Sequence, residues 1–335
     1  MTLSREPLVS VLTPVYNGEA YLAECIESVL AQTYSNWEYT IVNNCSKDGT
    51  LKVAQRYAQS DKRIRVCDND VFLDVILNHN KAFRSISASS KYCKVVSADD
   101  WLFPECIMRM VEVAEANPSV GLVGAYQLSG GGPDGRNWRV RWTALPYPST
   151  VISGREICRA QLLGAPYVFG TPTSLLYRSD LVRAHESFYP NKTTEADTSA
   201  CYVCLRDADF GFVHQVLSYE RIHTAQLSEW CRDVNTYTSS RLSDVMVYGP
   251  WFLTKAEVQA RTKEILGRYY EFLGISAVEF RDKEFWAYHK KRLAECGHPL
   301  SRFRLAKAVF AKLLDLLLNP KRTAEEALRR SGLSS

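Results

Sequence analysis

The first 125 residues alternate between short apolar segments, typical of strands, and amphipathic segments, typical of helices. Strands that are joined by helices pair mostly in parallel, because each connection has to cross one face of the sheet. The sequence therefore predicts an α/β fold in which helices cover both faces of a mostly parallel sheet. The strand patterns lie at residues 9–13, 39–42, 64–66, 92–96 and 121–126.

The pattern changes twice along the rest of the chain. Residues 129–135 are rich in glycine, so we expect a hairpin or loop there. Aromatic residues, prolines and short strand patterns follow, and from about residue 230 the pattern is helical. We therefore expect three parts, the last of which is a helical C-terminal extension: residues 7–126, 127–228 and 229–335.

The charge is unevenly distributed along the chain. In total, 41 basic and 37 acidic residues give a net charge of +4, but residues 1–250 carry −3 and residues 251–335 carry +7. A near-neutral body with a basic end lacks the concentrated basic face of a nucleic-acid-binding protein. The basic end is compatible with attraction to anionic lipid.

The ten cysteines are scattered, and the short polar N-terminal segment does not resemble a signal peptide. We therefore expect a cytoplasmic, reducing setting in which most cysteines are small buried hydrophobes. Cys201 and Cys204 have the spacing of a zinc pair, but no second pair of ligands accompanies them. No apolar stretch is long enough for a transmembrane helix, so the chain is expected to be soluble or peripheral on the inner face of the membrane.

Three polar loops follow the ends of predicted strands, at residues 13–17, 43–50 and 97–100. In a parallel sheet the carboxyl ends of the strands meet at one edge, and ligands bind there. We therefore expect the three loops to face one cleft.

These loops, in this order and spacing, resemble those of a family 2 glycosyltransferase with the GT-A (Rossmann-like) fold. The resemblance rests on Pro14-Val15-Tyr16-Asn17-Gly18, on residues 43–50, and on Ser97-Ala98-Asp99-Asp100 with Pro104 four residues on. Residues 28–34 are similar to a helix-end signature of the family. The resemblance is strong from residue 7 to about 125 and looser to about 225.

The resemblance implies an inverting, metal-dependent enzyme that moves a sugar from a nucleotide sugar, most simply UDP-linked, to a glycan or lipid-linked acceptor. Residues 7–126 would be the nucleotide-sugar-binding half and residues 127–228 the acceptor-binding half of one domain. Such an enzyme would build surface polysaccharide, lipopolysaccharide or another glycan.

The family's Asp-x-Asp element reads Ser97-Ala98-Asp99 in this chain. The resemblance implies Asp99 as a ligand of Mn²⁺ or Mg²⁺, with Asp100 beside it; oxygen ligands suit these cations, which neutralise a departing diphosphate. Ser97 and Ala98 would line the donor site. Because Ser97 stands where the family has an acid, the ribose and metal contacts there remain open. Alternatively, the two aspartates cap the following helix.

The resemblance also implies a set of nucleotide-binding residues. Asn43 and Asn44 stand where the family has two aspartates, and an asparagine carbonyl can still accept a hydrogen bond from a uracil N–H. Tyr16 corresponds to a residue that stacks on the base, and Asp48 to the acid of the second loop. Lys81 either approaches the diphosphate or is a solvated helix residue. The remaining members of the set are Pro14 and Asn17.

An inverting transfer needs a carboxylate that deprotonates the acceptor hydroxyl. By resemblance this base is Asp197, with Glu195 as the second choice; alternatively, both are ordinary acids at a helix N-terminus. Arg221-Ile222-His223 is similar to an element whose histidine reaches the metal or the diphosphate, although a lone histidine is more often structural. His214, inside an apolar run, is expected to be a core residue.

Residues 302–318 form an amphipathic helical pattern with basic residues beside its apolar face. Either this helix docks on the core, or it contacts a membrane surface together with the residues up to 330.

Other functions are still open. One alternative is a non-catalytic nucleotide-sugar binder with a degenerate site, and another is a membrane-interacting scaffold. A sugar-phosphate nucleotidyltransferase and a dehydrogenase are disfavoured, because the glycine-rich loop of the first and the G-x-G-x-x-G motif of the second are absent from this sequence.

Overall fold

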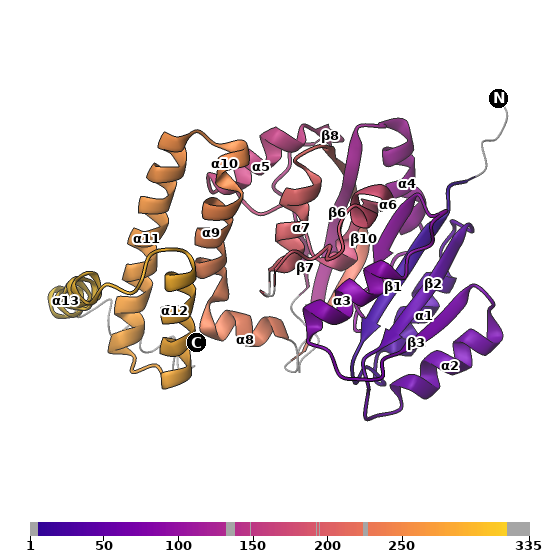
Figure 1. Cartoon of the computed structure of the whole chain (residues 1–335), viewed down its shortest axis with the longest axis horizontal. Coiled ribbons are helices and arrows are strands. Elements are labelled where there is room, and N and C mark those ends of the chain that lie inside the picture. The colour runs from indigo at the N-terminus through magenta and orange to yellow at the C-terminus, as the bar shows by residue number, and fades with distance from the viewer. Residues whose placement is uncertain are drawn as a thin grey trace. The chain divides into compact units, whose positions relative to one another are not determined.

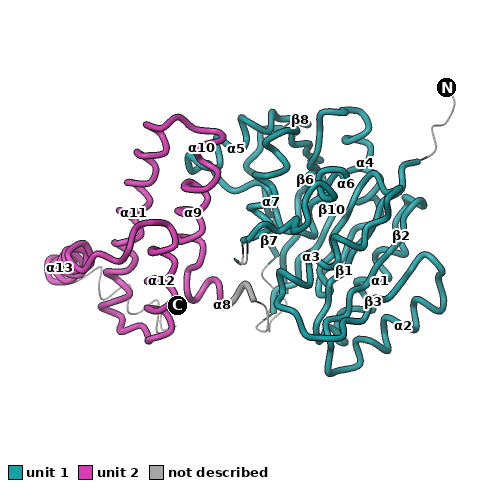
Figure 2. The backbone as a smooth tube through the Cα atoms, in the orientation of Figure 1, with its two compact units in different colours: residues 1–229 teal, residues 230–335 magenta. Residues whose placement is uncertain are grey.

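The computed structural model describes residues 6–131, 138–147, 149–191, 193, 195–223 and 227–319. The chain divides into two compact units, residues 1–229 and residues 230–335 (Figure 2). The first unit is an α/β domain and the second is helical (Figure 1). The expected α/β fold with C-terminal helices is confirmed.

The described strands of unit 1 form one sheet in the order β3-β2-β1-β4-β9-β6-β10-β5, with β7 paired to β6 and β8 paired to β10. Their bounds are β1 (Val9–Val15), β2 (Trp37–Asn43), β3 (Ile64–Asp68), β4 (Tyr92–Val95), β5 (Trp101–Leu102), β6 (Val120–Gly131), β7 (Arg139–Arg141), β8 (Val151–Ile152), β9 (Leu175–Arg178) and β10 (Asp209–Ile222).

The directions of the strands divide the sheet. β3, β2, β1 and β4 are parallel, as the alternating sequence pattern predicts. β9 is antiparallel to both β4 and β6, and β10 is parallel to β6 and antiparallel to β5. Strands β1 to β4 are therefore parallel to one another, whereas the part of the sheet that contains β9, β6, β10 and β5 is mixed. The glycine-rich segment 129–135, expected to be a hairpin or loop, begins inside β6; its residues 132–135 lie outside the described part of the chain.

Strand β1 extends two residues beyond the predicted end and includes Pro14. On the β4 side, the Leu12 carbonyl accepts a hydrogen bond from the backbone N–H of Val96. On the β2 side, the Val15 carbonyl accepts one from the backbone N–H of Asn44. The backbone groups of successive residues of β1 therefore point alternately toward β4 and β2. Pro14 faces the β4 side, beyond the last residue paired with β4. Its missing N–H therefore costs no ladder hydrogen bond.

The helices of unit 1 lie between and after the strands. They are α1 (Leu22–Leu30), α2 (Thr50–Ser60), α3 (Val75–Arg84), α4 (Cys106–Ala116), α5 (Gly154–Leu162), the 3₁₀ turn η1 (Pro172–Ser174), α6 (Ser179–Arg183) and α7 (Ala196–Cys204). The sequence predicts helices that begin near residues 19, 50, 78 and 104, and α1 to α4 begin within three residues of these positions.

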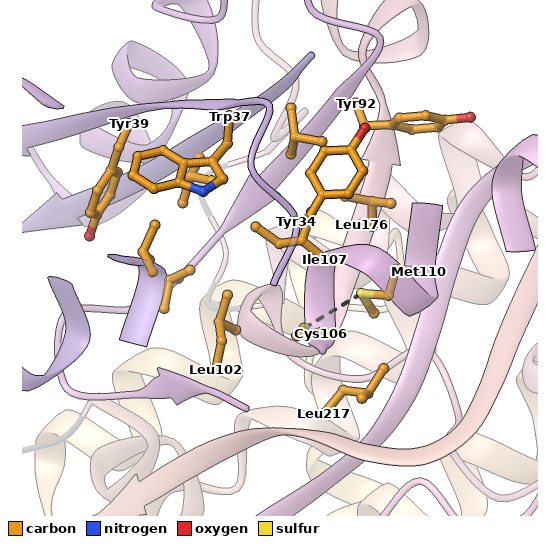
Figure 3. Close-up of a cluster of buried hydrophobic side chains, with 14 of the residues drawn as sticks. Tyr34, Trp37, Tyr39, Tyr92, Leu102, Cys106, Ile107, Met110, Leu176 and Leu217 are labelled. Atoms are coloured by element: carbon orange, nitrogen blue, oxygen red, sulfur yellow. Dashed lines mark hydrogen bonds between the residues drawn. The ribbon is translucent and has the colours of Figure 1, made fainter. Parts of the chain in front are cut away.

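Helices cover both faces of the sheet. On one face, Ile107 and Met110 of α4 belong to a buried cluster that includes Leu176 of β9 (Figure 3). On the other face, the Phe83 ring of α3 meets the ring of Tyr177, the next residue of β9, at a centroid distance of 6.2 Å. Successive strand residues point to opposite faces, so one short strand contributes to both cores.

Unit 2 consists of α9 (Thr236–Val247), α10 (Gly249–Phe252), α11 (Lys255–Val278), α12 (Lys283–Glu295) and α13 (Arg302–Leu318), while α8 (Leu227–Val234) crosses the boundary between the units. Its core includes His289, which binds the Tyr269 hydroxyl at 2.6 Å and the Val234 carbonyl at 2.9 Å. Burial lowers the pKa of His289 to about 4. A neutral histidine thus joins three segments of this unit.

Most of the cysteines are buried, as expected from the sequence. All ten cysteines are free thiols, and eight of them, including Cys201 and Cys204, are buried. Within the described ranges no group of three His, Cys, Asp or Glu residues is arranged to hold a metal ion. The described helices include none with the length and apolar character needed to cross a membrane.

Candidate functional site

The loops that follow β1 and β2 are joined by hydrogen bonds. The backbone N–H of Asn17 donates to Ser46 Oγ at 2.9 Å, and Asn17 Oδ1 accepts the N–H of Lys47 at 2.8 Å. The N–H of Gly18 donates to Thr50 Oγ1 at 2.8 Å. Asn17 has a φ of 51°, a conformation that asparagine tolerates better than most residues. The two loops therefore form one surface at the carboxyl edge of the sheet.

Asp48 stabilises this surface from within. Its carboxylate accepts hydrogen bonds from the N–H of Glu19 at 3.1 Å and from the N–H and hydroxyl of Thr50 at 3.1 and 2.5 Å. Partial burial acts to raise the pKa of Asp48, but the hydrogen bonds from Thr50 and Glu19 outweigh it and hold the pKa below its usual value. The carboxylate is charged and engaged in shaping the loop.

Asn44, predicted to contact the base, is buried and binds a third loop. Its Oδ1 accepts hydrogen bonds from the N–H of Leu73 and from Asn69 Nδ2, both at 2.9 Å, and its Nδ2 donates to the Leu73 carbonyl at 2.8 Å. Asn43 is also buried and donates to Asp68 Oδ1 at 2.7 Å. In this structure the asparagines hold the segment after β3 against the end of β2.

That segment brings Phe72 to Tyr16. The two rings meet edge to face at a centroid distance of 4.9 Å, and the side chains are 60% and 47% exposed. Val71 and Val75 beside them are also exposed. Exposed aromatic rings at a ligand-binding edge offer faces for a base to stack on. Sequence reasoning identified Tyr16 but missed Phe72, for which the signal was the apolar run Val71-Phe72-Leu73 inside the otherwise polar segment 68–74.

The loop after β4 contains two neighbouring aspartates in different environments. Asp100 is buried; its Oδ2 accepts a hydrogen bond from the Thr173 hydroxyl at 2.6 Å and its Oδ1 accepts one from the N–H of Arg221 at 3.1 Å. Burial, together with the charge of Asp99, raises the pKa of Asp100 well above its usual value. Both oxygens of Asp100 thus support η1 and β10.

Asp99 lies on the more accessible side of the loop. Its Oδ2 is 3.1 Å from His223 Nε2, at the end of β10, and its carbonyl accepts a hydrogen bond from Arg221 Nε at 3.2 Å. The His223 ring lies 5.2 Å from the Tyr21 ring between centroids. A carboxylate and an imidazole are therefore adjacent, although the two residues are far apart in the sequence.

This pair fits a divalent cation that is shared with a ligand. Mg²⁺ and Mn²⁺ bind carboxylates, and Mg²⁺ is commonly held by one or two carboxylates together with substrate phosphates. Asp99 and His223 would supply two protein ligands. The sequence also predicts Asp100 as a metal ligand, but its oxygens accept hydrogen bonds from Thr173 and Arg221.

Residues of η1 hold the acidic loop in place. The Ser97 N–H donates to Thr173 Oγ1 at 3.1 Å, and the two hydroxyl oxygens are 3.2 Å apart. Lys94, buried in β4, donates from Nζ to the carbonyls of Thr173 and Leu175. Ala98 lies beside Gly18, where an added Cβ would be 3.5 Å from the Ala98 Cβ. Ser97 and Ala98 are thus part of the wall between the β1 and β4 loops.

The other candidate acids lie at the start of α7. Asp197 Oδ1 accepts the N–H of Thr198 at 2.7 Å. Loss of solvation on burial, with repulsion from Glu195, outweighs this hydrogen bond and raises the pKa of Asp197 to about 7. The Tyr167 hydroxyl contacts Thr198 Oγ1 at 2.8 Å and donates to the Gly170 carbonyl at 3.2 Å, which links α7 to the segment before η1.

Helix α3 connects the two halves of the site. Asn78 Oδ1 accepts from Asn69 Nδ2 at 2.9 Å on the side of the β3 loop. Asn80 exchanges two hydrogen bonds with the backbone of Tyr189, at 3.1 and 2.8 Å, in the segment that leads to α7. Lys81 is the next residue, half-buried in the last turn of the same helix. Asn78 and Asn80 thus tie α3 to the segments on either side of it, while the sequence assigned a role in this stretch only to Lys81.

A family model described as glycosyl transferase family 2 matches residues 10–185, more than half of the chain. Among relatives, the O-antigen biosynthesis protein RfbC of Myxococcus xanthus is 31% identical over 123 residues, which are 36% of this chain and 10% of that protein. The chain spans 13%, 36% and 56% of the lengths of the first three curated relatives that it matches.

Two solved structures have similar folds. TarS residues 1–349 of S. aureus, in complex with UDP-GlcNAc, align with a TM-score of 0.62 and 17% identity over 96% of this chain and 92% of that one. The mannosyltransferase PcManGT of Pyrobaculum calidifontis, in complex with GDP-Man and Mn²⁺, aligns with a TM-score of 0.55 and 15% identity over 94% of this chain and 88% of that one. At such identities the likeness concerns the fold.

Proposed function

Because the chain belongs to glycosyl transferase family 2 and has a GT-A fold, we propose that it transfers a sugar from a nucleotide-activated donor to an acceptor hydroxyl, with inversion at the anomeric carbon. The proposal is supported by the adjacent Asp99 and His223 side chains and by a separate carboxyl in the same unit, Asp197, whose pKa is raised to about 7. A metal ligand and a general base are the two kinds of group that such a transfer requires.

In the proposed reaction Asp197 acts as the base. The acceptor oxygen bonds to the anomeric carbon as the bond from that carbon to the diphosphate breaks, and the leaving nucleoside diphosphate takes the electron pair. The hydroxyl proton passes to the Asp197 carboxylate. A carboxyl with a pKa of about 7 is well matched to accepting a proton near neutral pH. Glu195 tunes this group through its charge.

Asp99 and His223 are the residues that would hold a divalent cation. A bound Mn²⁺ or Mg²⁺ supplies charge that stabilises the departing diphosphate. The Mn²⁺ in PcManGT supports this assignment, as does the exposure of Asp99 relative to Asp100. Asp100 then keeps the loop in position through Thr173 and the Arg221 backbone.

The proposed donor is a UDP-sugar whose base stacks on the exposed rings of Tyr16 and Phe72. UDP-GlcNAc in TarS supports the choice of uridine. Asn17, Pro14 and the Asp48-braced loop would line the nucleotide site, and Lys81 would approach the diphosphate. The name of RfbC supports a glycan acceptor in surface polysaccharide synthesis.

A thermal-shift screen tests this function directly. UDP-, GDP-, dTDP- and CMP-sugars are compared with and without Mn²⁺, in the wild-type protein and in Asp99→Ala. Stabilisation by UDP-sugars that needs both Mn²⁺ and Asp99 supports the donor site. The absence of a shift with every donor contradicts it and favours a degenerate site.

The screen is paired with an assay of turnover. Mn²⁺-dependent hydrolysis or transfer of the sugar excludes a non-catalytic binder. Formation of a nucleotide sugar from a sugar phosphate and a nucleoside triphosphate would instead identify a nucleotidyltransferase.

A further inference from the structure

Helix α13 presents apolar side chains on two sides. One side packs on α11, where an added Cβ at Gly274 would lie 2.8 Å from Ala308. The Ser301 N–H donates to the Tyr270 hydroxyl of α11 at 2.7 Å. Helix α13 therefore packs on α11 within unit 2, but this contact accounts for only one side of the helix.

The opposite side forms an exposed apolar face. Phe303, Phe310 and Leu317 are 79%, 67% and 78% exposed. They are spaced by seven residues, so on an α-helix they fall within about 20° of one line. We call this the α13 apolar face; it consists of Phe303, Ala306, Phe310, Leu313, Leu314 and Leu317, and no residue of α13 is fully buried.

Basic residues flank the α13 apolar face. At about 100° per residue, Arg302 lies on one side of the line and Lys307 and Arg304 lie on the other. All three are exposed. The one acid of the helix, Asp315, pairs with Lys312 at 3.6 Å toward the packed side. An exposed apolar stripe between cations is the arrangement of helices that lie in a lipid interface, where the cations reach anionic headgroups.

We propose that α13 binds the surface of an anionic lipid bilayer through the α13 apolar face. A second copy of the chain is the main competing occupant, and two observations disfavour it. Pairing two such helices would bring their cations together. A stable interface buries ~800 Å² per partner, whereas a helix of this length presents a strip of only about 26 Å by 10 Å. This proposal does not depend on the proposed glycosyl transfer.

Flotation of the full chain with vesicles tests the proposal. The vesicles are phosphatidylcholine alone, or phosphatidylcholine mixed with an equal part of phosphatidylglycerol. We expect the wild-type protein to float with the mixed vesicles and to remain below with phosphatidylcholine alone, because the cations need anionic headgroups. Equal flotation with both vesicles, or with neither, overturns the proposal.

Two double variants assign the binding to α13. Phe303→Ser/Phe310→Ser is expected to lower partitioning into mixed vesicles about tenfold or more. Its matched control, Val247→Ser/Phe280→Ser, removes two exposed apolar side chains of unit 2 outside α13 and is expected to float like the wild type. Because the substituted side chains are exposed, circular dichroism should show unchanged helix content in both.

Charge is tested in the same way. Arg302→Gln/Lys307→Gln should weaken binding to mixed vesicles, whereas Lys283→Gln/Lys290→Gln, two exposed lysines of α12, should not. Undiminished flotation of the Phe303→Ser/Phe310→Ser variant overturns the proposal. A second outcome also overturns the proposal: sedimentation shows that the wild-type protein is a dimer, the Phe303→Ser/Phe310→Ser variant is a monomer, and neither protein binds vesicles. That result would assign the α13 apolar face to contact with a second copy of the chain.

Discussion

The loop after β4 and the first turn of α7 both contribute aspartates to unit 1, but the structure surrounds them differently. Asp100 is held from outside its own loop, by the Thr173 hydroxyl of η1 and the Arg221 backbone of β10. Asp197 accepts its hydrogen bond from the next residue of its own helix, Thr198. Burial raises the pKa of both carboxyls.

This difference suggests how one residue type serves separate tasks. A carboxyl whose oxygens satisfy donors from two other elements holds those elements together and is costly to remove. A carboxyl that is desolvated but bound only within its own helical turn can exchange a proton with a ligand. Asp99 represents a third case, because its carboxylate faces an imidazole.

The largest effect on the rate of transfer is expected for Asp197 in α7, rather than for the aspartates of the loop after β4. Asp197→Asn should lower the rate of sugar transfer by about 10²–10⁴-fold, because the amide cannot accept the acceptor proton. Donor binding, measured by thermal shift, should be retained. Full activity in this variant contradicts the assignment of the base. Glu195→Gln is the matched control and should keep most of the activity.

The next largest effect distinguishes Asp99 from its neighbour Asp100 in the loop after β4. Asp99→Ala should lower transfer about a hundredfold or more and abolish the Mn²⁺ dependence of donor binding, because a carboxylate ligand is lost. Its thermal unfolding without ligand should be close to that of the wild type. Calorimetric titration with Mn²⁺ and UDP measures the binding, and unaltered Mn²⁺ dependence would place the cation elsewhere.

The aromatic pair should affect the donor rather than the chemistry. Tyr16→Ala is expected to raise the donor KM about ten- to a hundredfold, since stacking of a base on an aromatic ring contributes about 1–3 kcal/mol. Phe72→Ala should raise it in the same direction, and kcat should change little for both. A change confined to kcat would argue against stacking.

Removal of Asp100 should lower stability. Asp100→Ala leaves the Thr173 hydroxyl and the Arg221 N–H without this acceptor, so we expect the free energy of unfolding to fall by about 1–3 kcal/mol. Urea unfolding of this variant and of Asp99→Ala, side by side, measures the difference. Equal stability of the two variants would mean that the environments of the neighbours do not differ as described.

The smallest effect is a shift of the pH profile. The base acts as a carboxylate, so kcat/KM should rise with pH through about 7 and level off above it. Glu195 raises the pKa of Asp197 by charge repulsion. Glu195→Gln should therefore move the rising limb to lower pH, by a fraction of a pH unit. A limb that stays in place, or that moves upward, contradicts this coupling.

Much of the fold could be read from local pattern. Apolar periodicity located the strands and helices of the first 125 residues to within a few positions, and residues 302–318 match the bounds of α13. His214, expected to be a core residue, is instead only half-buried, with its ring nitrogens hydrogen-bonded to the Tyr126 hydroxyl and the Ser149 carbonyl. The insertion of β9 between β4 and β6 could not be read, because it joins segments that lie far apart in the chain.

The positions at which polar loops follow strands can be read from the sequence alone, and they predict that residues near Tyr16, Asn44 and Asp99 lie at one edge of the sheet. Which side chains remain accessible at that edge depends on the folded structure: Asn44 binds the loop after β3, and Phe72 contacts Tyr16. The physical reason is the range of the interactions. Strand and helix patterns depend on neighbours in sequence, whereas burial, hydrogen-bond partners and shifted pKa values depend on residues brought together by the fold.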